Sequence, residues 1–253
     1  MFNVGLVSVS FRKNTPEDIV NASAAAGLSC IEWGGDVHAV PGNIDRAREI
    51  CAMTEAAGMS VAAYGSYYRL GEENRTDFNN ILETAKALNA PIIRVWAYNK
   101  GSSEISKEEY IKAADDAERI CGMAGEMNIK IALECHANTL TDDYKSSLRL
   151  LKDVSSSNLY MYWQPNQFRD EEYNLKALSN LSQYITNVHV FQWDKFNKYP
   201  LEAGKEIWGK YLELLSKSGR DQNLLLEFMP DDRIETLKKE AGTLMSFINN
   251  DIG

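Results

Sequence analysis

The sequence is poor in the residues that several common functions require. Its 253 residues include three histidines and four cysteines, and the cysteines are far apart with no CxxC pair: Cys30, Cys51, Cys121 and Cys135. Cysteines spaced in this way are typical of reduced, mostly buried thiols in a reducing compartment. The sequence therefore predicts no disulfide framework.

An excess of positive charge and a long apolar run are also missing. The chain has 27 lysines and arginines against 36 aspartates and glutamates, a net charge of −9. An acidic surface repels phosphate backbones, so no nucleic-acid partner is expected. No apolar run approaches the roughly 20 residues of a membrane span, and residues 2–9 are too polar for a signal peptide. We expect a cytoplasmic protein with no membrane partner.

Short apolar runs alternate with amphipathic stretches along the whole chain. Apolar residues make up 44% of the sequence, which is ample for a core. The runs predict strands, which we place at residues 4–10, 29–33, 60–65, 92–97, 130–136, 159–164, 186–191 and 223–229. The stretches between them predict helices, at residues 15–26, 43–57, 76–88, 106–127, 141–154, 171–183, 204–216 and 233–249.

Eight strand–helix units in about 250 residues match the size and rhythm of a (β/α)8 TIM barrel of the α/β class. A doubly wound open sheet is the alternative, and it usually has a glycine-rich turn after its first strand. Residues 11–15, which follow the first predicted strand, contain no glycine. No Pro/Gly/Ser linker divides the chain, so residues 1–253 are expected to form a single barrel domain.

Two carboxylates lie in otherwise apolar strand-like runs. Glu134 is flanked by Leu133 and Cys135, and Glu227 is flanked by Leu226 and Phe228. A carboxylate is costly to bury unless it is paired, hydrogen-bonded or bound to a metal. Because barrel enzymes keep their chemistry at the C-terminal ends of strands, the pair points to a site.

Four successive strands end in a polar residue between apolar neighbours: Glu134, Gln164, His189 and Glu227. Side chains alternate along a strand, so these four are expected to face the barrel axis near its mouth. Carboxylate, amide and imidazole groups suit Mn²⁺, Mg²⁺, Zn²⁺ or Co²⁺, and we predict a divalent metal site there. A hydrogen-bonded polar plug at the barrel mouth is the structural alternative.

Three segments resemble the xylose-isomerase-like TIM-barrel superfamily, the sugar phosphate isomerase/epimerase family. Residues 133–142 (LECHANTLTD) resemble its stretch after the fifth strand, residues 31–38 its second-strand motif, and residues 187–193 its seventh strand. In that family the metal is held by Glu, Asp, His and Glu, which correspond here to Glu134, Gln164, His189 and Glu227. The chain departs from the family at Gln164, which replaces Asp, and at Gln167, where a His is common.

The resemblance implies a metal-dependent sugar isomerase or epimerase that removes a proton next to a carbonyl and passes through an enediolate. Glu134 and Glu227 would be the catalytic pair, or ligands alone. Dehydration of a keto-polyol on the same scaffold is one alternative, and a carbohydrate-binding barrel without catalysis, its metal site weakened by Gln164, is another. An abasic-site endonuclease would need several zinc ions and more histidines. A homodimer or homotetramer is expected by resemblance.

Six further residues are candidates for substrate contact: His38, His136, Arg94, Trp96, Gln167 and Trp193. For His38 a place in a surface loop is nearly as plausible, and Arg94 is alternatively a buried ion-pair partner. His136 shares a strand face with Glu134 and would touch substrate or orient that carboxylate. The tryptophans would stack on a sugar or simply pack. Because no glycine-rich phosphate cradle follows the last strands, an unphosphorylated sugar or polyol is expected.

Overall fold

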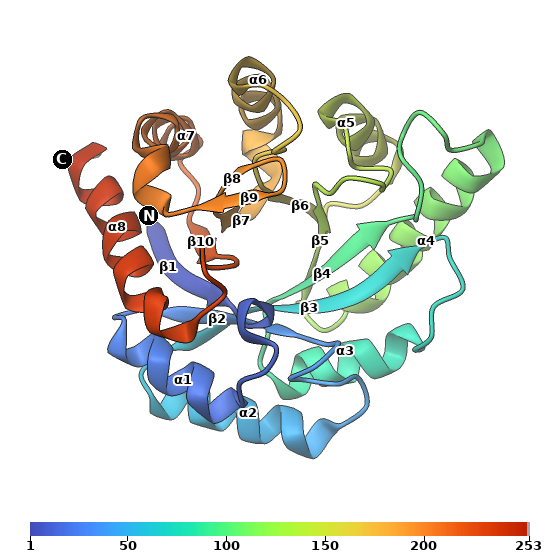
Figure 1. The fold of residues 1–253 in the computed structure, drawn as a ribbon. Coiled ribbons are helices and arrows are strands. Elements are labelled where there is room, and N and C mark those ends of the chain that lie inside the picture. Colours follow the sequence, from blue (N-terminus) through green and yellow to red (C-terminus); the bar gives the residue numbers. More distant parts are fainter. Residues whose placement is uncertain (252–253) are drawn as a thin grey trace.

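The protein is an eight-stranded parallel barrel in a computed structural model that describes residues 1–251. The strands close in the order β1-β10-β7-β6-β5-β4-β3-β2 (Figure 1). They are β1 (Phe2–Val7), β2 (Cys30–Gly34), β3 (Ser60–Leu70), β4 (Ile92–Ala97), β5 (Lys130–Glu134), β6 (Leu159–Trp163), β7 (Ile185–Val190) and β10 (Gln222–Leu226). The predicted (β/α)8 fold is confirmed.

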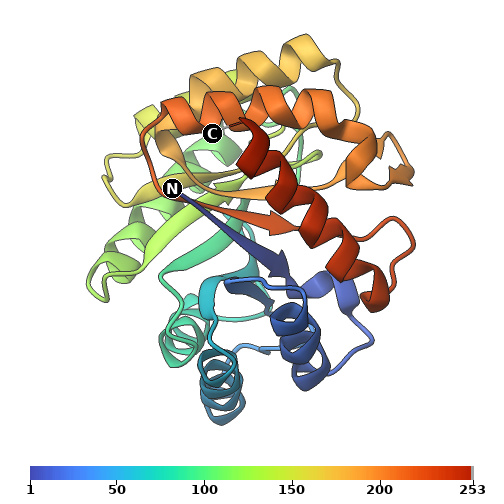
Figure 2. The ribbon, with the colours of Figure 1, turned by 90° about the vertical axis from the view of Figure 1, so that its left-hand side faces the viewer.

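A helix follows each barrel strand and packs on the outside of the barrel (Figures 1 and 2). The helices are α1 (Pro16–Ala25), α2 (Ile44–Ala56), α3 (Phe78–Ala87), α4 (Lys107–Gly125), α5 (Tyr144–Asp153), α6 (Glu171–Leu181), α7 (Lys205–Lys217) and α8 (Leu237–Asp251). Local sequence fixes where they begin. Thr15 and Asp18 form a capping box at α1 with a proline at its first position, and Ser106 and Glu109 form another at α4. None of the helices in residues 1–251 is long and apolar enough to cross a bilayer.

Alternation along the strands divides the core into two apolar clusters. The larger lies between the strands and the helices, and includes Ile93, Val95 and Leu133. The smaller fills the lower barrel with mostly small side chains, including Cys30 and Ala132. Side chains alternate along each strand, so every second residue points into the barrel. Polar residues near the C-terminal ends of the strands therefore converge inside the barrel, above the smaller cluster.

The structure corrects several predicted boundaries and adds one hairpin. Strands β5 and β10 end at Glu134 and Leu226, short of the predicted residues 136 and 229, so Glu227 directly follows its strand. The first strand ends at Val7, and Ser8–Phe11 form a 3₁₀ turn, η1, rather than more strand. Strand β3 runs on to Leu70. A small antiparallel hairpin, β8 (Gln192–Asp194) and β9 (Asn197–Tyr199), follows β7. Its strands have three residues each and are largely polar, so no apolar alternation marks them in the sequence.

Three further 3₁₀ turns lie close to the helices, and they are η2 (Ser182–Tyr184), η3 (Leu201–Gly204) and η4 (Ile234–Thr236). The cysteines are free thiols, of which Cys30, Cys51 and Cys121 are buried and Cys135 is half-buried. The expectation of mostly buried, unpaired cysteines is therefore confirmed.

Candidate active site

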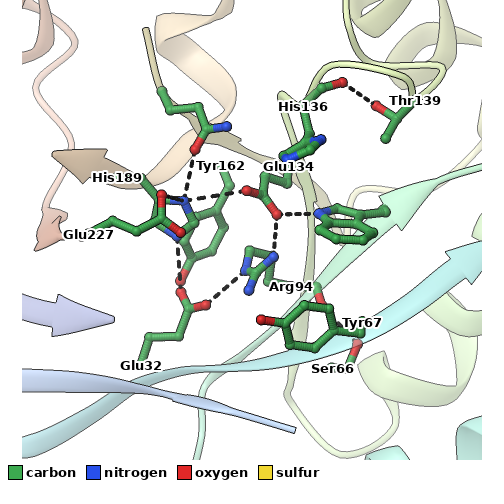
Figure 3. A network of polar contacts seen from close by, with 12 residues as sticks. Glu32, Ser66, Tyr67, Arg94, Glu134, His136, Thr139, Tyr162, His189 and Glu227 are labelled. Atoms are coloured by element: carbon green, nitrogen blue, oxygen red, sulfur yellow. Dashed lines mark hydrogen bonds and ion pairs between the residues drawn. The ribbon is translucent and has the colours of Figure 1, made fainter. Parts of the chain in front are cut away.

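Side chains from the ends of four neighbouring strands meet where three of them surround the fourth, at His189 Nδ1 (Figure 3). Gln164 Oε1 lies 3.0 Å from this atom, and Glu134 Oε1 lies 3.5 Å from it. Glu227 Oε2 lies 3.4 Å from the same nitrogen. The four residues predicted as metal ligands are thus together, at the C-terminal end of the barrel.

Glu134 is held by two donors from β4. Its Oε2 accepts hydrogen bonds from the Arg94 guanidinium and from the Trp96 indole N–H. Its Oε1 is the oxygen that faces His189. The carboxylate is therefore fixed through one oxygen while the other remains directed at the four-residue cluster.

Arg94 is fully buried and lies between two carboxylates. Its Nε donates to Glu32 Oε1 at 2.8 Å, while another N–H of the guanidinium donates to Glu134. A Cβ atom at Gly65 would lie 2.7 Å from Arg94 Nη2 and 2.7 Å from Glu32 Oε1. Only glycine leaves enough room there, so the residue at position 65 is part of what makes this buried pair possible.

Glu32 also supports the imidazole from below. Its Oε2 lies 3.5 Å from His189 Nε2, on the side of the ring opposite the cluster. A carboxylate at Nε2 holds a proton on that nitrogen, so Nδ1 is the nitrogen that would give up its proton to bind a cation. Figure 3 shows Glu32 beneath the ring, with the ligand-like oxygens of Glu134 and Glu227 on the far side.

A line of hydrogen bonds reaches Glu32 from the floor of the barrel. Asn3 contacts Asn223 at 3.1 Å, and Asn223 contacts Asn187 at 3.3 Å. Asn187 then donates to the Tyr162 hydroxyl, which faces Glu32 and lowers the pKa of that carboxyl. Because a carboxylate only accepts, Tyr162 must donate to it, and every amide in the line must then donate in the same direction. The last donor in the line, the Tyr162 hydroxyl, thereby stabilises the negative charge of Glu32.

The charges shift the pKa values of the group in different directions. Burial opposes ionisation of Glu32, but Arg94 and His189 outweigh it and lower the pKa of Glu32 to about 2. Burial likewise disfavours the imidazolium, but Glu227, Glu134 and Glu32 raise the pKa of His189 to about 10. Burial and the neighbouring carboxylates raise the pKa of Glu227. The cluster therefore attracts positive charge, as a proton or as a cation.

The donor set fits a divalent cation. Ligands bound at about 2.0–2.2 Å in tetrahedral or octahedral geometry lie roughly 3 to 3.6 Å apart. The three distances from His189 Nδ1, 3.0, 3.4 and 3.5 Å, fall in that range. Three carboxylates against the single guanidinium of Arg94 leave two negative charges when His189 is neutral, which a divalent ion would balance.

A cavity of about 210 Å³ opens above the cluster. It is lined by Val9, Arg12, Tyr67, Arg94, Trp96, Glu134, His136, Gln164, Gln167, Phe191, Trp193, Glu227 and Phe228. The set includes five of the six residues predicted to contact substrate. His136 packs against Trp96 with ring centres 5.0 Å apart, and Trp193 lies between Phe191 and Phe228. For Arg94 the sequence left two roles open, substrate contact and a buried ion pair. The structure shows Arg94 both lining the cavity and paired with Glu32.

The sixth, His38, lies elsewhere. It is buried against Trp33, and its Nδ1 is 3.0 Å from Ser8 Oγ. The His38 ring does not line the cavity. Its contact with Ser8 instead connects the loop after β2 to the residue that directly follows β1.

Sequence reasoning missed four residues that shape the site: Glu32, Tyr162, Tyr67 and Arg12. Glu32 carried a readable signal, because it lies between Ile31 and Trp33 in an apolar run, as Glu134 does in its own. Tyr67 and Arg12 carried no such signal in the sequence. A bulge in β3 brings Tyr67 to the cavity, and the short turn η1 brings Arg12 there.

The fold and the cluster define a (β/α)8 barrel with an acidic, ion-pairing centre at the C-terminal ends of its strands. The model of the family described as xylose isomerase-like TIM barrel matches residues 20–249, and the chain belongs to that family.

One curated relative and two solved structures show the range of the neighbours. A 3-dehydroshikimate dehydratase of Bacillus anthracis is 39% identical over 67 residues, a match that spans 26% of this chain and 24% of that protein. The structure of a probable 3-DHS dehydratase from Bacillus anthracis aligns over 97% of this chain and 99% of its own, with 21% identity and a TM-score of 0.80. A D-psicose 3-epimerase from Clostridium cellulolyticum H10 aligns over 98% of both chains, with 14% identity and a TM-score of 0.77.

Proposed function

We propose that the protein is a metal-dependent sugar isomerase or epimerase that removes a proton from the carbon next to a carbonyl. The observation that supports this most directly is the pair Glu134 and Glu227, whose carboxylates face one cavity from either side of His189. Together with Gln164, these residues would hold the ion. When bound, a divalent cation polarises the substrate carbonyl and stabilises the negative charge of an enediolate.

The two carboxylates are held differently, and this difference suits two roles. Glu134 is tied to Arg94 and Trp96 and cannot swing away from the cluster. Among residues 1–251 the ion-pair partner of Glu227 is His189, so its carboxylate is less restrained at the cavity wall. We propose that one removes the substrate proton on one face and that the other returns a proton on the opposite face.

The cavity suits a small substrate. Its volume of about 210 Å³ is below the roughly 300–1,000 Å³ of pockets for drug-sized ligands. Trp96 and Tyr67 form one wall and Trp193 and Phe228 another, and aromatic rings of this kind stack on the apolar faces of sugars. A monosaccharide or polyol is the proposed substrate. A homodimer or homotetramer remains a proposal, which sedimentation of the purified chain would test.

Deuterium exchange tests the proton abstraction without knowledge of the final product. The protein is incubated with Mn²⁺ and D-tagatose in D₂O, and proton NMR follows loss of the signal from the carbon next to the carbonyl. Glu134→Gln and Glu227→Gln should each abolish exchange. Glu240→Gln is the matched control, because Glu240 is a buried glutamate on α8 that accepts from the Leu201 N–H. Near wild-type exchange in both site variants would show that the acid–base assignment is wrong.

Dehydration of a hydroxy-ketone is a second candidate, favoured by the short match to a 3-dehydroshikimate dehydratase. It begins with the same proton abstraction and continues with loss of a hydroxyl group from the next carbon. NMR and mass spectrometry of the products formed from D-tagatose and from 3-dehydroshikimate would separate the two, since dehydration removes one water and isomerisation leaves the composition unchanged. Absence of any response to metal, with or without these compounds, would favour a barrel that binds carbohydrate without catalysis.

A further inference from the structure

Tyr67 has a backbone conformation that side chains rarely adopt. Its φ is 59°, and it lies where the register of β3 against β4 shifts between Gly65 and Arg69. Across this bulge β3 advances from residue 65 to 69 while β4 advances from 94 to 96. A bulky residue in the left-handed region costs energy and is tolerated most often at functional sites. Here the bulge places the ring in the cavity wall.

The hydroxyl of Tyr67 has a free hydrogen. Arg12 Nη2 donates to its oxygen at 2.8 Å, and because a guanidinium only donates, the tyrosine must be the acceptor in that contact. Burial raises the pKa of Tyr67 to about 12, so the group keeps its proton at neutral pH. The ring is fixed by Trp96, 5.4 Å away, and by the Arg94 guanidinium, also 5.4 Å away. In Figure 3 the hydroxyl points toward the space beside Arg94.

Both arginines that line the cavity have their charge cancelled. Arg12, in the cavity wall, forms an ion pair with Asp36, and the two side chains are 44% and 30% exposed. Arg94 is paired with Glu32 and Glu134. The cavity wall therefore offers hydrogen-bond donors whose positive charges are already balanced, which favours a neutral oxygen over an anionic group.

We propose that Tyr67 is a specificity-determining residue that donates a hydrogen bond to a hydroxyl oxygen of a neutral polyhydroxy-ketone. Arg12 and Asp36 are positioning residues in this scheme. Arg12 aims the tyrosine oxygen, and Asp36 cancels the charge of Arg12 so that carboxylates and phosphates gain no advantage. This inference rests on the proposed function and names the substrate class of the same site.

Tyr67→Phe tests the hydroxyl, since it keeps the ring and its contacts. With Mn²⁺ and D-tagatose as the probe, loss of one hydrogen bond should raise KM by roughly 2- to 12-fold. The turnover number should change much less, and the thermal midpoint should stay close to that of the wild type. A KM within 1.5-fold of the wild-type value would overturn the role of Tyr67.

Asp36→Asn tests the charge balance, because it should improve binding of an acid rather than weaken binding of the sugar. Freed of its partner, Arg12 should attract an acid, so the preference for 3-dehydroshikimate over D-tagatose should rise by about fivefold or more, about 1 kcal/mol. The double variant Asp36→Asn/Arg12→Gln should lose the gain. Asp45→Asn is the matched control, because Asp45 pairs with Arg48 on α2, outside the cavity.

The outcomes separate this inference from the function on which it rests. If the wild type with Mn²⁺ binds neither probe, as measured by calorimetry, the proposed function fails and the inference fails with it. If the wild type acts on D-tagatose but Asp36→Asn gains nothing for the acid, only the charge-balance role is wrong. A wild type that prefers 3-dehydroshikimate to D-tagatose would overturn the neutral substrate class while leaving proton abstraction in place.

Discussion

Replacing Glu32 by glutamine should weaken both the stability of the protein and its affinity for a metal ion. Glu32 is fully buried and accepts from Arg94 Nε at 2.8 Å, with His189 Nε2 at 3.5 Å on its other oxygen. Its pKa of about 2 means that its surroundings stabilise the charged form over the neutral one. Glutamine keeps the size and one acceptor oxygen but removes the charge.

The expected loss of stability depends on which carboxylates still neutralise Arg94 in the variant. Breaking a buried ion pair costs about 3–5 kcal/mol, and because Glu134 still neutralises the guanidinium, we expect a loss near 3 kcal/mol. For a chain of this size that corresponds to a fall in the thermal midpoint of roughly 6–12 °C. If His189 ligates the ion as proposed, loss of the carboxylate that orients its ring should also weaken metal binding by about 10- to 100-fold.

Calorimetry measures both quantities, with a thermal scan of the metal-free protein and a titration with Mn²⁺. Glu240→Gln again provides the control, because that buried glutamate accepts one backbone N–H at 2.7 Å and lies on the outer helix α8. It should cost about 1 kcal/mol and leave Mn²⁺ affinity unchanged. If Glu32→Gln bound Mn²⁺ as tightly as the wild type, Glu32 would not orient His189, and an equal loss in both variants would indicate a general effect of destabilisation.

Three further predictions concern the cluster and its surroundings. Gln164→Glu, which has the same length and adds a charge, should raise Mn²⁺ affinity at least tenfold, and calorimetry showing no gain would remove residue 164 from the ligand set. Tyr162→Phe ends the donor line to Glu32 and should weaken Mn²⁺ binding by a few-fold, whereas unchanged affinity would make that line purely structural. Burial lowers the pKa of His38, so the unfolded chain takes up a proton at His38 at higher pH than the folded one, and the contribution of His38 to the free energy of unfolding should fall as pH drops below about 6.5. The raised pKa of His189 acts in the opposite direction, so the test is the difference between wild type and His38→Gln in denaturant melts. The variant should gain stability relative to the wild type between pH 7.5 and 5.5, and a difference that does not change with pH would exclude the His38 contribution.

Much of the fold could be read from the sequence because its signals are local. Apolar runs of five or six residues separated by amphipathic stretches predict strands and helices, and the capping pattern at Thr15 fixes where α1 begins. The hairpin β8–β9 was missed because its short polar strands are held by backbone pairing with no apolar face. The strand prediction ran through residues 8–10 of the turn Ser8–Phe11 because Val9 prolongs the apolar run of β1.

The predicted cluster was readable for a similar reason. Alternation along parallel strands places every second residue on the barrel axis, so Glu134, Gln164, His189 and Glu227 could be assigned to one space from their positions alone. The same argument applied to Glu32 would have added it. His38 could not be placed in this way, because it lies in the loop after β2 and its side chain turns toward Ser8.

The sequence by itself determined the barrel, the family and the polar residues at the strand ends, because these depend on periodicity and on short motifs. Only the tertiary structure decided how the charges are paired: Arg94 between Glu32 and Glu134, and Arg12 with Asp36 beside Tyr67. Those partners are 24 to 62 residues apart along the chain, and no local pattern relates them. They meet because barrel closure, the space at Gly65 and a bulge in β3 bring distant side chains into contact.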